Sequence, residues 1–294
     1  MTAKLIDGKH IAQVIRDKYK TRVDELIKQG IHPGLGVIIV GNDPASRVYV
    51  GNKTKACQSV GINSKQIELP ETVSEEDLLA EVDKLNNDPE VNGILVQLPL
   101  PEHIDVNNVL AKISVEKDVD GFHLYNIGAL VTGKMIFPPC TPYGIKCLLE
   151  YTNVDVEGKN AVVVGSSNIV GKPMALMLLQ MNATVSICNI YTYYLTQYTV
   201  LADILIVATG VPGLIKKEMV KPGAVVIDVG INRLPDGRLV GDVDFEGVKE
   251  VASYITPVPG GVGPMTITML LVNTIMAAER SNKIAKPYID FNIS

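Results

Sequence analysis

The sequence has no excess of basic residues. Lys and Arg number 27 against 32 Asp and Glu, which gives a formal net charge of −5 at pH 7. Proteins that bind nucleic acid neutralise its phosphates with Lys and Arg, and this charge balance supplies no positive electrostatic field to attract them. We therefore expect a small-molecule ligand and no nucleic-acid partner.

Cysteines are few, and long hydrophobic runs are missing. The cysteines are Cys57, Cys140, Cys147 and Cys188, with no CxxC pair among them, and the four histidines lack metal-ligand spacing. This pattern is not that of a zinc site or a disulfide framework, and it favours buried thiols in a reducing compartment. No segment approaches the roughly 18 uninterrupted apolar residues of a membrane-spanning helix. We expect a cytoplasmic protein with no bound metal and no membrane anchor.

The remaining composition is that of a globular chain with about two domains. The 294 residues are 47% hydrophobic and 20% charged. Because domains have roughly 150 residues on average, this length suggests two of them. Helical spacing covers residues 10–28, 43–60, 74–85, 171–180 and 264–280, and strand patterns cover residues 34–41, 65–69, 91–97, 160–164, 184–188, 204–208, 224–229 and 254–258. The alternation predicts an α/β fold in two lobes with a cleft between them, each built on a parallel sheet. The proline-bearing residues 137–142 suit a hinge.

A glycine-bearing loop follows the strand at residues 160–164. It begins at Gly165 and reaches Gly171, where a helix starts. Such a loop lets backbone approach a phosphate beside the N–H donors of the helix N-terminus, although Ser167 stands where the usual pattern has its second glycine. The alternatives are a nucleotide site and a plain strand-to-helix turn.

Tyr49 and Lys53 stand four positions apart on a predicted helix, so they project from one face. A lysine that is partly desolvated loses proton affinity and becomes available as a general base, whereas the same spacing also fits a surface lysine. Gln97 ends a buried strand, where it is either a ligand contact or a satisfied strand-end amide. Asp118 and Asp120 in a polar turn could bind a metal, cap a helix or hold a ring edge through a carboxylate.

Residues 257–264 are too rich in glycine and proline for a strand or helix, yet they precede a strongly helical segment with Pro264 predicted at its first position. We expect a shaped backbone loop facing a ligand.

Six segments in this order resemble the bifunctional methylenetetrahydrofolate dehydrogenase/methenyltetrahydrofolate cyclohydrolase family. They are DPASRVYVGNK (43–53), GILVQLPLP (93–101), KDVDGFH (117–123), PCTP (139–142), SNIVGKPMA (167–175) and YITPVPGGVGPMT (254–266). The resemblance covers essentially the whole chain. It implies a homodimer in which residues 1–141 with 270–294 form a folate-binding catalytic domain and residues 142–269 form a Rossmann-like NAD(P)-binding domain.

The resemblance also implies roles for single residues. Tyr49 stacks on the pterin, Lys53 is the key catalytic residue, Gln97 hydrogen-bonds Lys53, and Asp120 anchors the pterin. The substrate-binding residues further include Pro259, Gly260 and Gly261. The implied cofactor-binding residues are Gly165, Ser166, Ser167, Ile190, Thr192, Gly210 and Ile231.

The cofactor segment departs from the family pattern. NADP-dependent members usually carry Arg where this chain has Ser166, and a His-Ser-basic-Thr run where it has Asn189-Ile-Tyr-Thr192. Residues 173–202 contain no Asp, Glu, Lys or Arg, so a ribose 2′-phosphate finds few charged partners there. Lys172 or another element could substitute. No acidic residue ends the second strand to hold an unphosphorylated ribose, so a preference for NAD does not follow. The family resemblance favours NADP, with NAD also possible. We expect Tyr191, Tyr193, Tyr194 and Tyr198 to pack on a helix.

The expected function is oxidation of methylenetetrahydrofolate to the methenyl form and hydrolysis of that product to formyltetrahydrofolate. One alternative is a cyclohydrolase alone, whose dehydrogenase activity is lost or shifted to NAD. Others are a different two-lobe dehydrogenase acting on a small acid and a non-catalytic folate-binding protein.

Overall fold

The computed structural model describes residues 2–284, with the side chain of residue 45 set aside, and the chain divides into two compact units. Within the described range, one unit comprises residues 14–140 and 267–284, and the other comprises residues 2–13 and 141–266. We call them the three-stranded unit and the six-stranded unit after their main sheets. Two long helices, α1 (Gly8–Lys28) and α10 (Val262–Ser281), contribute residues to both units.

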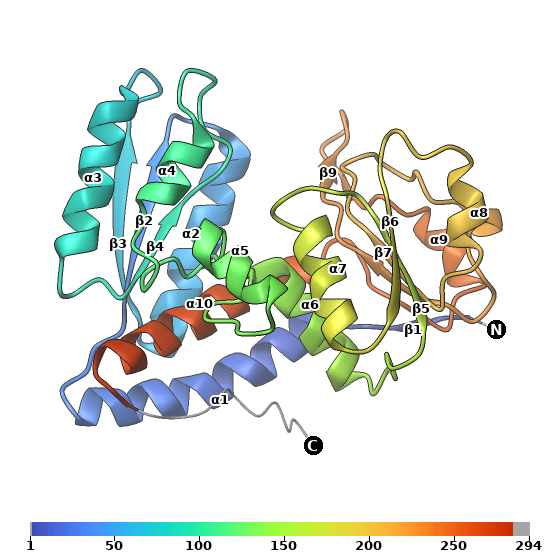
Figure 1. Ribbon diagram of the computed structural model, residues 1–294, viewed down its shortest axis with the longest axis horizontal. Helices are drawn as coiled ribbons and strands as arrows, with labels where there is room; N and C mark the ends of the chain where they lie inside the picture. Colours follow the sequence, from blue (N-terminus) through green and yellow to red (C-terminus); the bar gives the residue numbers. More distant parts are fainter. Residues whose placement is uncertain (1, 285–294) are drawn as a thin grey trace. The chain divides into compact units, whose positions relative to one another are not determined.

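The three-stranded unit holds a parallel sheet in the order β3-β2-β4 (Figure 1). Its strands are β2 (Gly34–Val40), β3 (Asn63–Leu69) and β4 (Gly93–Val96), and its own helices are α2 (Pro44–Val60), α3 (Glu75–Asn87), α4 (Val106–Lys112) and α5 (Leu124–Val131). Every residue of the central strand β2 is buried, as its uninterrupted apolar run predicts. Helix α2 packs along β2 and β3, which brings one of its faces to the sheet.

The bounds of α2 follow from local chemistry that the sequence displays. The Asp43 side chain accepts a hydrogen bond from the Ser46 N–H, Pro44 occupies the first turn, and Gly61 ends the helix in the left-handed region at φ 85°. The predicted start and stop of this helix are confirmed. Its register is therefore fixed at both ends, and so is the direction in which each of its side chains projects.

The six-stranded unit holds a parallel sheet in the order β1-β11-β8-β7-β5-β6. Its strands are β1 (Lys4–Leu5), β5 (Asn160–Val164), β6 (Thr184–Cys188), β7 (Ile204–Val207), β8 (Val225–Asp228) and β11 (Tyr254–Ile255). A separate hairpin consists of β9 (Asn232–Arg233) and β10 (Leu239–Val240). The other helical elements are α6 (Cys140–Tyr151), α7 (Gly171–Gln180), α8 (Leu195–Thr199), α9 (Phe245–Lys249) and the 3₁₀ turn η1 (Lys217–Met219). The chain moves from β5 outward to β6 and then crosses back to β7. In open sheets of this kind, ligands bind at the carboxyl ends of the strands where the winding reverses, which here lies between β5 and β7.

Three of the differences between the observed elements and the sequence predictions concern the proline-rich loop, the last helix and the start of the chain. The expected strand at residues 254–258 is only Tyr254–Ile255, because Pro257 and Pro259 have no N–H for a ladder. Helix α10 begins at Val262 rather than at Pro264. Residues 2–13, assigned by sequence to the catalytic domain, lie in the six-stranded unit, because Lys4 and Leu5 pair with β11.

The boundary between the units also bears on the predicted domain limits. It falls between residues 140 and 141, inside the segment that we expected to form a hinge. The second boundary follows residue 266, three positions before the predicted end of the cofactor domain. Residues 285–294, assigned by sequence to the catalytic domain, lie outside the described residues.

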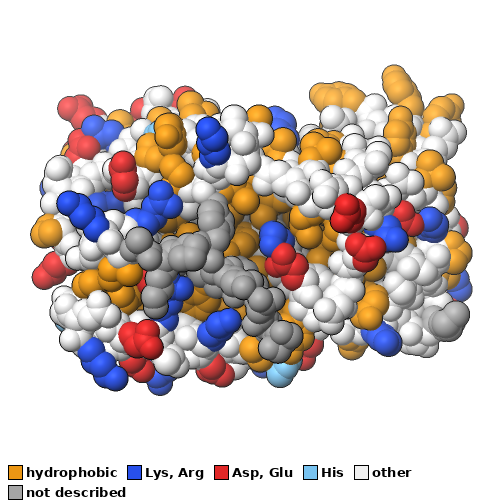
Figure 2. All heavy atoms as spheres, turned by 60° about the horizontal axis from the view of Figure 1, so that its bottom comes forward, with side chains coloured by type: hydrophobic (Ala, Val, Ile, Leu, Met, Phe, Trp, Pro, Cys, Tyr) orange, Lys and Arg blue, Asp and Glu red, His pale blue; other side chains and the backbone are white. Residues whose placement is uncertain are grey.

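Helix α10 is long and apolar enough to cross a membrane by length and composition, but 78% of its apolar window is buried inside the protein. Burial of this extent is typical of a core helix. On the face in Figure 2, Lys and Arg side chains are interspersed with Asp and Glu rather than gathered into one basic area.

Candidate functional site

A lysine and a glutamine meet in the three-stranded unit. Lys53 projects from α2, and its Nζ donates a hydrogen bond of 2.9 Å to Oε1 of Gln97, the residue that follows β4. The N–H of Gln97 donates to the Ile38 carbonyl of β2 at 2.8 Å, and its Nε2 donates to the Leu98 carbonyl at 2.6 Å. The backbone N–H and one side-chain N–H of Gln97 thus bond within the sheet and the following turn, and the side-chain oxygen accepts from the lysine.

Asp120 is placed by a turn that its neighbour Asp118 organises. The buried carboxylate of Asp118 accepts hydrogen bonds from the His123 N–H at 2.8 Å and from Nδ2 of Asn126 at 2.7 Å. Gly121 adopts φ 79°, and a Cβ on it would lie 2.7 Å from the Phe137 carbonyl oxygen, so the turn leaves no room for a side chain there. Asp118 therefore serves the turn as a cap, whereas Asp120 remains available to the site.

Burial reduces the proton affinity of the Lys53 amine. Burial lowers the pKa of Lys53, while the nearby carboxyl of Asp120 opposes that shift. Burial also raises the pKa of Asp120, with Lys53 opposing it. Tyr49, one helical turn before Lys53, is half-buried, and burial raises the pKa of its hydroxyl, so its ring stays uncharged. The structure thus places all four predicted catalytic residues, Tyr49, Lys53, Gln97 and Asp120, in one unit, and a hydrogen bond joins Lys53 to Gln97.

Two thiols belong to this cluster, whereas the sequence predicted only that the cysteines are buried. Cys57 lies one turn beyond Lys53 on α2, and Cys140 interacts with the Asp120 carboxyl and lies 3.3 Å from the Val119 carbonyl oxygen. Burial raises the pKa of Cys57 to about 12, so this thiol remains neutral beside the lysine. The spacing of four between Lys53 and Cys57 could have identified one of them, whereas nothing local in the sequence connects Cys140 to Asp120.

The cysteines are free thiols, and two of the histidines have structural contacts. All four cysteines are buried and unpaired in disulfides, as predicted. His123 caps α5 through its Nδ1, and His103 Nε2 lies 2.8 Å from the Val73 carbonyl oxygen. In the part of the chain that the structure describes, no group of three His, Cys, Asp or Glu side chains could hold a metal ion.

The predicted cofactor loop lies at the carboxyl ends of β5 and β7. Gly165 adopts φ 119°, and a Cβ there would lie 2.1 Å from the Ala208 carbonyl oxygen. A Cβ on Gly171, the first residue of α7, would lie 2.0 Å from the Gly165 carbonyl oxygen. Both glycines are required because backbone meets backbone, and this close approach keeps the N-terminus of α7 directly behind the edge where a dinucleotide would lie.

The other predicted cofactor residues surround the same edge with uncharged groups. Ser167 accepts hydrogen bonds from the Val170 and Gly171 N–H groups, and Thr192 accepts one of 2.8 Å from the Asn189 N–H. Ser166 is half-buried, and Gly210 and Ile231 follow β7 and β8. Ile190 is 91% exposed. The structure therefore gathers these residues on one unit, in which residues 173–202 supply no Lys or Arg.

The tyrosines of this segment do not pack as expected. Tyr191, Tyr193 and Tyr194 are 85%, 86% and 77% exposed, and Tyr198 is 43% exposed. The helix that was to receive them, α8, has only five residues, and it offers too little surface to cover four rings. The prediction of packing was wrong.

The loop with Pro259, Gly260 and Gly261 also belongs to the six-stranded unit. The Gly260 carbonyl accepts a hydrogen bond of 2.9 Å from the Lys9 N–H, and a Cβ on Gly8 would lie 1.9 Å from the Gly261 carbonyl oxygen. The loop is thus held against the start of α1 by backbone contacts, which confirms its shaped, irregular backbone. Its contact with substrate stays a prediction.

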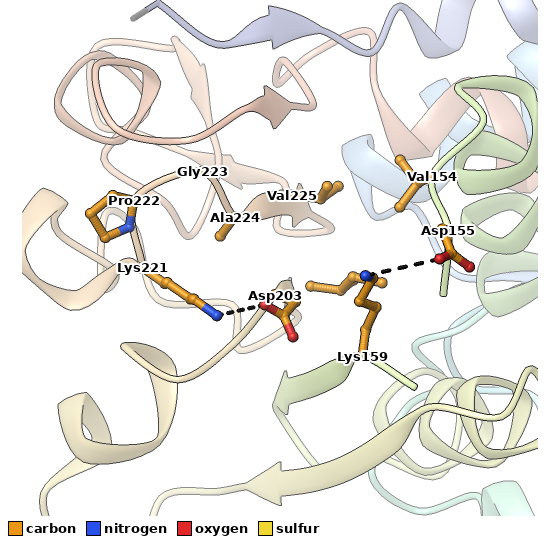
Figure 3. Close-up of a pocket in the computed structure, with 10 residues that line it drawn as sticks. Val154, Asp155, Lys159, Asp203, Lys221, Pro222, Gly223, Ala224 and Val225 are labelled. Atoms are coloured by element: carbon orange, nitrogen blue, oxygen red, sulfur yellow. Dashed lines mark hydrogen bonds and ion pairs between the residues drawn. The ribbon is translucent and has the colours of Figure 1, made fainter. Parts of the chain in front are cut away.

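A separate pocket of about 230 Å³ opens at the amino ends of β5, β7 and β8 (Figure 3). Its charged side chains are engaged with one another, since Lys221 pairs with Asp203 at 2.6 Å and Lys159 with Asp155 at 3.9 Å. It lies at the sheet edge opposite the one where parallel α/β sheets bind ligands.

Comparison with known proteins agrees with this geometry. The family model for the tetrahydrofolate dehydrogenase/cyclohydrolase catalytic domain matches residues 6–120, and that for the NAD(P)-binding domain matches residues 139–282. A protein of Nitrosospira multiformis named bifunctional protein FolD is 60% identical over 96% of this chain and 98% of its own length.

Solved structures agree as well. A bifunctional FolD enzyme, methylenetetrahydrofolate dehydrogenase/cyclohydrolase from Campylobacter jejuni, is 51% identical with a TM-score of 0.93, covering 95% of this chain and 99% of its own. The corresponding Trypanosoma brucei enzyme, complexed with NADP cofactor and an inhibitor, is 39% identical with a TM-score of 0.93, covering 96% and 99%. The resemblance seen in the sequence is confirmed, and the chain belongs to the tetrahydrofolate dehydrogenase/cyclohydrolase family.

Proposed function

We propose that this protein oxidises methylenetetrahydrofolate to methenyltetrahydrofolate with NADP and hydrolyses the product to formyltetrahydrofolate. One observation supports the proposal above all. The Lys53 amine is hydrogen-bonded to Gln97, its pKa is lowered by burial, and the carboxyl group of Asp120 lies nearby. Family membership supplies the substrate class. We also propose a cytoplasmic homodimer, as the family resemblance implies.

In hydrolysis, neutral Lys53 acts as the general base. A water oxygen bonds to the methenyl carbon while Nζ of Lys53 takes a proton from that water. The carbon–nitrogen bond to one ring nitrogen of the adduct then breaks as that nitrogen takes the proton back from the Lys53 ammonium. The hydroxyl of the adduct loses its proton to water, which leaves a formyl carbonyl on the other nitrogen and neutral Lys53. Gln97 fixes the position of the amine through its side-chain oxygen. An ammonium at this position could not accept the proton, so the lowered pKa of Lys53 is a requirement of the step.

In oxidation, the one-carbon bridge loses a hydride and becomes a methenyl cation. The bound NADP supplies the hydride acceptor. A charged lysine beside this developing cation would raise its energy, whereas a neutral amine does not. Tyr49 offers an uncharged ring for stacking on the pterin, and the Asp120 carboxyl offers an acceptor for the pterin ring edge.

The carboxyl edge of the six-stranded sheet fits a dinucleotide. Gly165 and Gly171 leave backbone where any side chain would collide, and α7 presents its N-terminus behind them. We assign pyrophosphate contact to Gly165, Ser166 and Ser167, and the flanking contacts to Ile190, Thr192, Gly210 and Ile231. The segment from Asn189 to Thr192 carries no cation for the ribose 2′-phosphate, so we expect NADP to be held mainly by hydrogen bonds and backbone.

The test follows methenyl absorbance after mixing enzyme with methylenetetrahydrofolate and NADP, then NAD, then neither. Absorbance that rises with NADP and then decays faster than in buffer is the expected result. No rise with either cofactor, together with fast decay of added methenyltetrahydrofolate, would leave a cyclohydrolase alone. Binding of folate with neither rise nor accelerated decay would identify a non-catalytic folate-binding protein.

A further inference from the structure

Two aspartates are fully enclosed in the six-stranded unit, close to the proposed cofactor edge. Asp228 ends β8 and is 3% exposed, and Asp242 follows β10 and is 0% exposed. Among the described residues, the hydrogen-bond partners of both carboxylates are uncharged N–H and O–H groups. A buried carboxylate is costly, and it persists where its hydrogen bonds fix something in place.

Asp228 holds the segment that carries Asp242. Its Oδ1 accepts hydrogen bonds from the Gly230 N–H at 3.0 Å and from the Asp242 N–H at 2.9 Å, and its Oδ2 accepts one from the Val243 N–H at 3.0 Å. Its own N–H donates to Oγ1 of Thr256 at 2.8 Å. The backbone of residues 242–243 is therefore tied to the end of β8.

Asp242 in turn holds the loop that follows β7. Its Oδ2 accepts hydrogen bonds from the Thr209 N–H at 2.6 Å, the Thr209 hydroxyl at 3.0 Å and the Gly210 N–H at 2.9 Å. Its Oδ1 accepts one of 2.8 Å from Nδ2 of Asn232. One carboxylate thus unites the loop after β7 with the hairpin after β8.

The surrounding backbone is built closely around the two carboxylates. A Cβ on Gly230 would lie 2.1 Å from Oδ1 of Asp242, and a Cβ on Gly241 would lie 1.8 Å from Oδ2 of Asp228. Neither glycine has a left-handed φ, so steric space alone requires glycine at both positions. The loops after β7 and β8 therefore have a single arrangement set by the carboxylates.

The loop that Asp242 holds lies at the reversal point of the sheet. The carboxyl end of β7 adjoins that of β5, and the Ala208 carbonyl lies against Gly165 of the predicted phosphate loop. A dinucleotide at this edge lies between the loops after β5 and β7. Displacement of Thr209 and Gly210 would change one wall of its site.

We propose that Asp242 is a positioning residue for the dinucleotide, which it serves by fixing residues 209–210, and that Asp228 supports it. This inference rests on the proposed cofactor function. Asp242 touches no reacting atom, and its effect is on cofactor affinity. A purely structural aspartate would lower stability without a selective change in dinucleotide binding.

The first test replaces Asp242→Asn, which keeps the shape but puts an N–H donor against N–H donors on one side. Binding of NADP is measured by isothermal titration calorimetry, beside the KM for NADP and the rate of methenyltetrahydrofolate hydrolysis. We expect the Kd for NADP to rise about 10-fold or more, as loss of hydrogen bonds to a charged group implies, with KM rising more than kcat falls. Asp244→Asn is the matched control, because its side chain does not cap α9 or hold the loop; we expect its Kd to match wild type.

A second pair covers the case in which Asp242→Asn does not fold. Thr209→Val removes the hydroxyl bond to Asp242 and keeps the side-chain shape, and Thr209→Ser restores that hydroxyl. We expect Thr209→Val to raise the Kd for NADP about 3-fold to 10-fold and Thr209→Ser to return it toward wild type. An unchanged Kd in folded Asp242→Asn, or in Thr209→Val, overturns the inference. Wild-type protein that binds no NADP overturns the proposed cofactor function instead.

Discussion

The two units of the molecule use different means to prepare for their ligands. In the three-stranded unit, ionisable side chains face the site, and their pKa values are shifted by burial around Lys53 and Asp120. In the six-stranded unit, the proposed cofactor residues are glycines and uncharged side chains, while carboxylates lie behind them and fix the loops. We infer that proton transfer belongs to the three-stranded unit and that the six-stranded unit supplies the shape of the cofactor site. Substitutions should therefore separate the two functions.

The largest expected effect is on proton transfer. Lys53→Met removes the base, and hydrolysis of methenyltetrahydrofolate should fall about 10²-fold to 10⁴-fold. Binding of NADP should not change, since its proposed contacts belong to the six-stranded unit. Lys55→Met is the matched control because Lys55 lies on the same helix and is exposed. Normal hydrolysis by a folded Lys53→Met protein would remove this lysine from the mechanism.

The next effect concerns shape. Gly165→Ala combines a φ of 119°, which is strained for alanine, with a Cβ contact of 2.1 Å to the Ala208 carbonyl oxygen. We expect the free energy of unfolding to fall by about 3 kcal/mol or more, and NADP binding to be lost. Gly223→Ala is the control: it has φ 84° in the same unit but no atom near its Cβ, so it should cost only about 1 kcal/mol. Urea unfolding measures both, and equal losses would contradict the role of close approach.

A third effect concerns the pH dependence of stability that Asp228 gives to the six-stranded unit. Burial, with a smaller contribution from Asp242, raises the pKa of Asp228 to about 6. An acid whose folded pKa exceeds its unfolded value of about 3.9 binds more protons when folded, so its stability contribution is largest below pH 4 and is lost as pH rises through 6. We expect the difference in unfolding free energy between wild type and Asp228→Asn to change by about 3 kcal/mol between pH 4 and pH 7.5. A difference independent of pH would show that Asp228 does not titrate in this range.

The smallest expected effect comes from adding a positive charge to the loop that follows β5. Ser166→Arg places a cation beside the glycine loop, and the affinity for NADP should rise about 5-fold to 10-fold relative to that for NAD. Ser166→Gln supplies length without charge and should leave the ratio unchanged. The two dissociation constants, measured at one salt concentration, decide the matter. Equal gains for both cofactors would place the ribose phosphate elsewhere.

Much of the site was predictable because its local chemistry is visible in the sequence. The Asp43 cap and the Gly61 stop fix the register of α2, and this register puts Tyr49 and Lys53 on one face. The hydrogen bond from Lys53 to Gln97 joins residues far apart in sequence, and only the family resemblance indicated it. Periodicity cannot specify a contact between a helix and the end of a strand.

Other features left no signal that pattern reasoning could use. A two-residue strand at Lys4–Leu5 has no periodicity, so its pairing with β11 was missed. Asp228 reads as the end of a buried strand and Asp242 as a residue of a polar hairpin, and only their burial reveals the network between them. The exposed tyrosines were misjudged because hydrophobic composition predicts burial on average, while the five-residue α8 cannot provide it.

The proposed hydrolysis depends above all on the protonation state of Lys53, which can be measured directly. The side-chain resonances of Lys53, assigned by comparison with Lys53→Arg, are followed by NMR as pH is raised in the folded enzyme. We expect the pKa of Lys53 to lie below the ordinary lysine value of 10.5 and to coincide with the pH at which kcat for hydrolysis rises. Titration at or above 10.5, with hydrolysis already at full rate near neutral pH, would contradict a neutral lysine base.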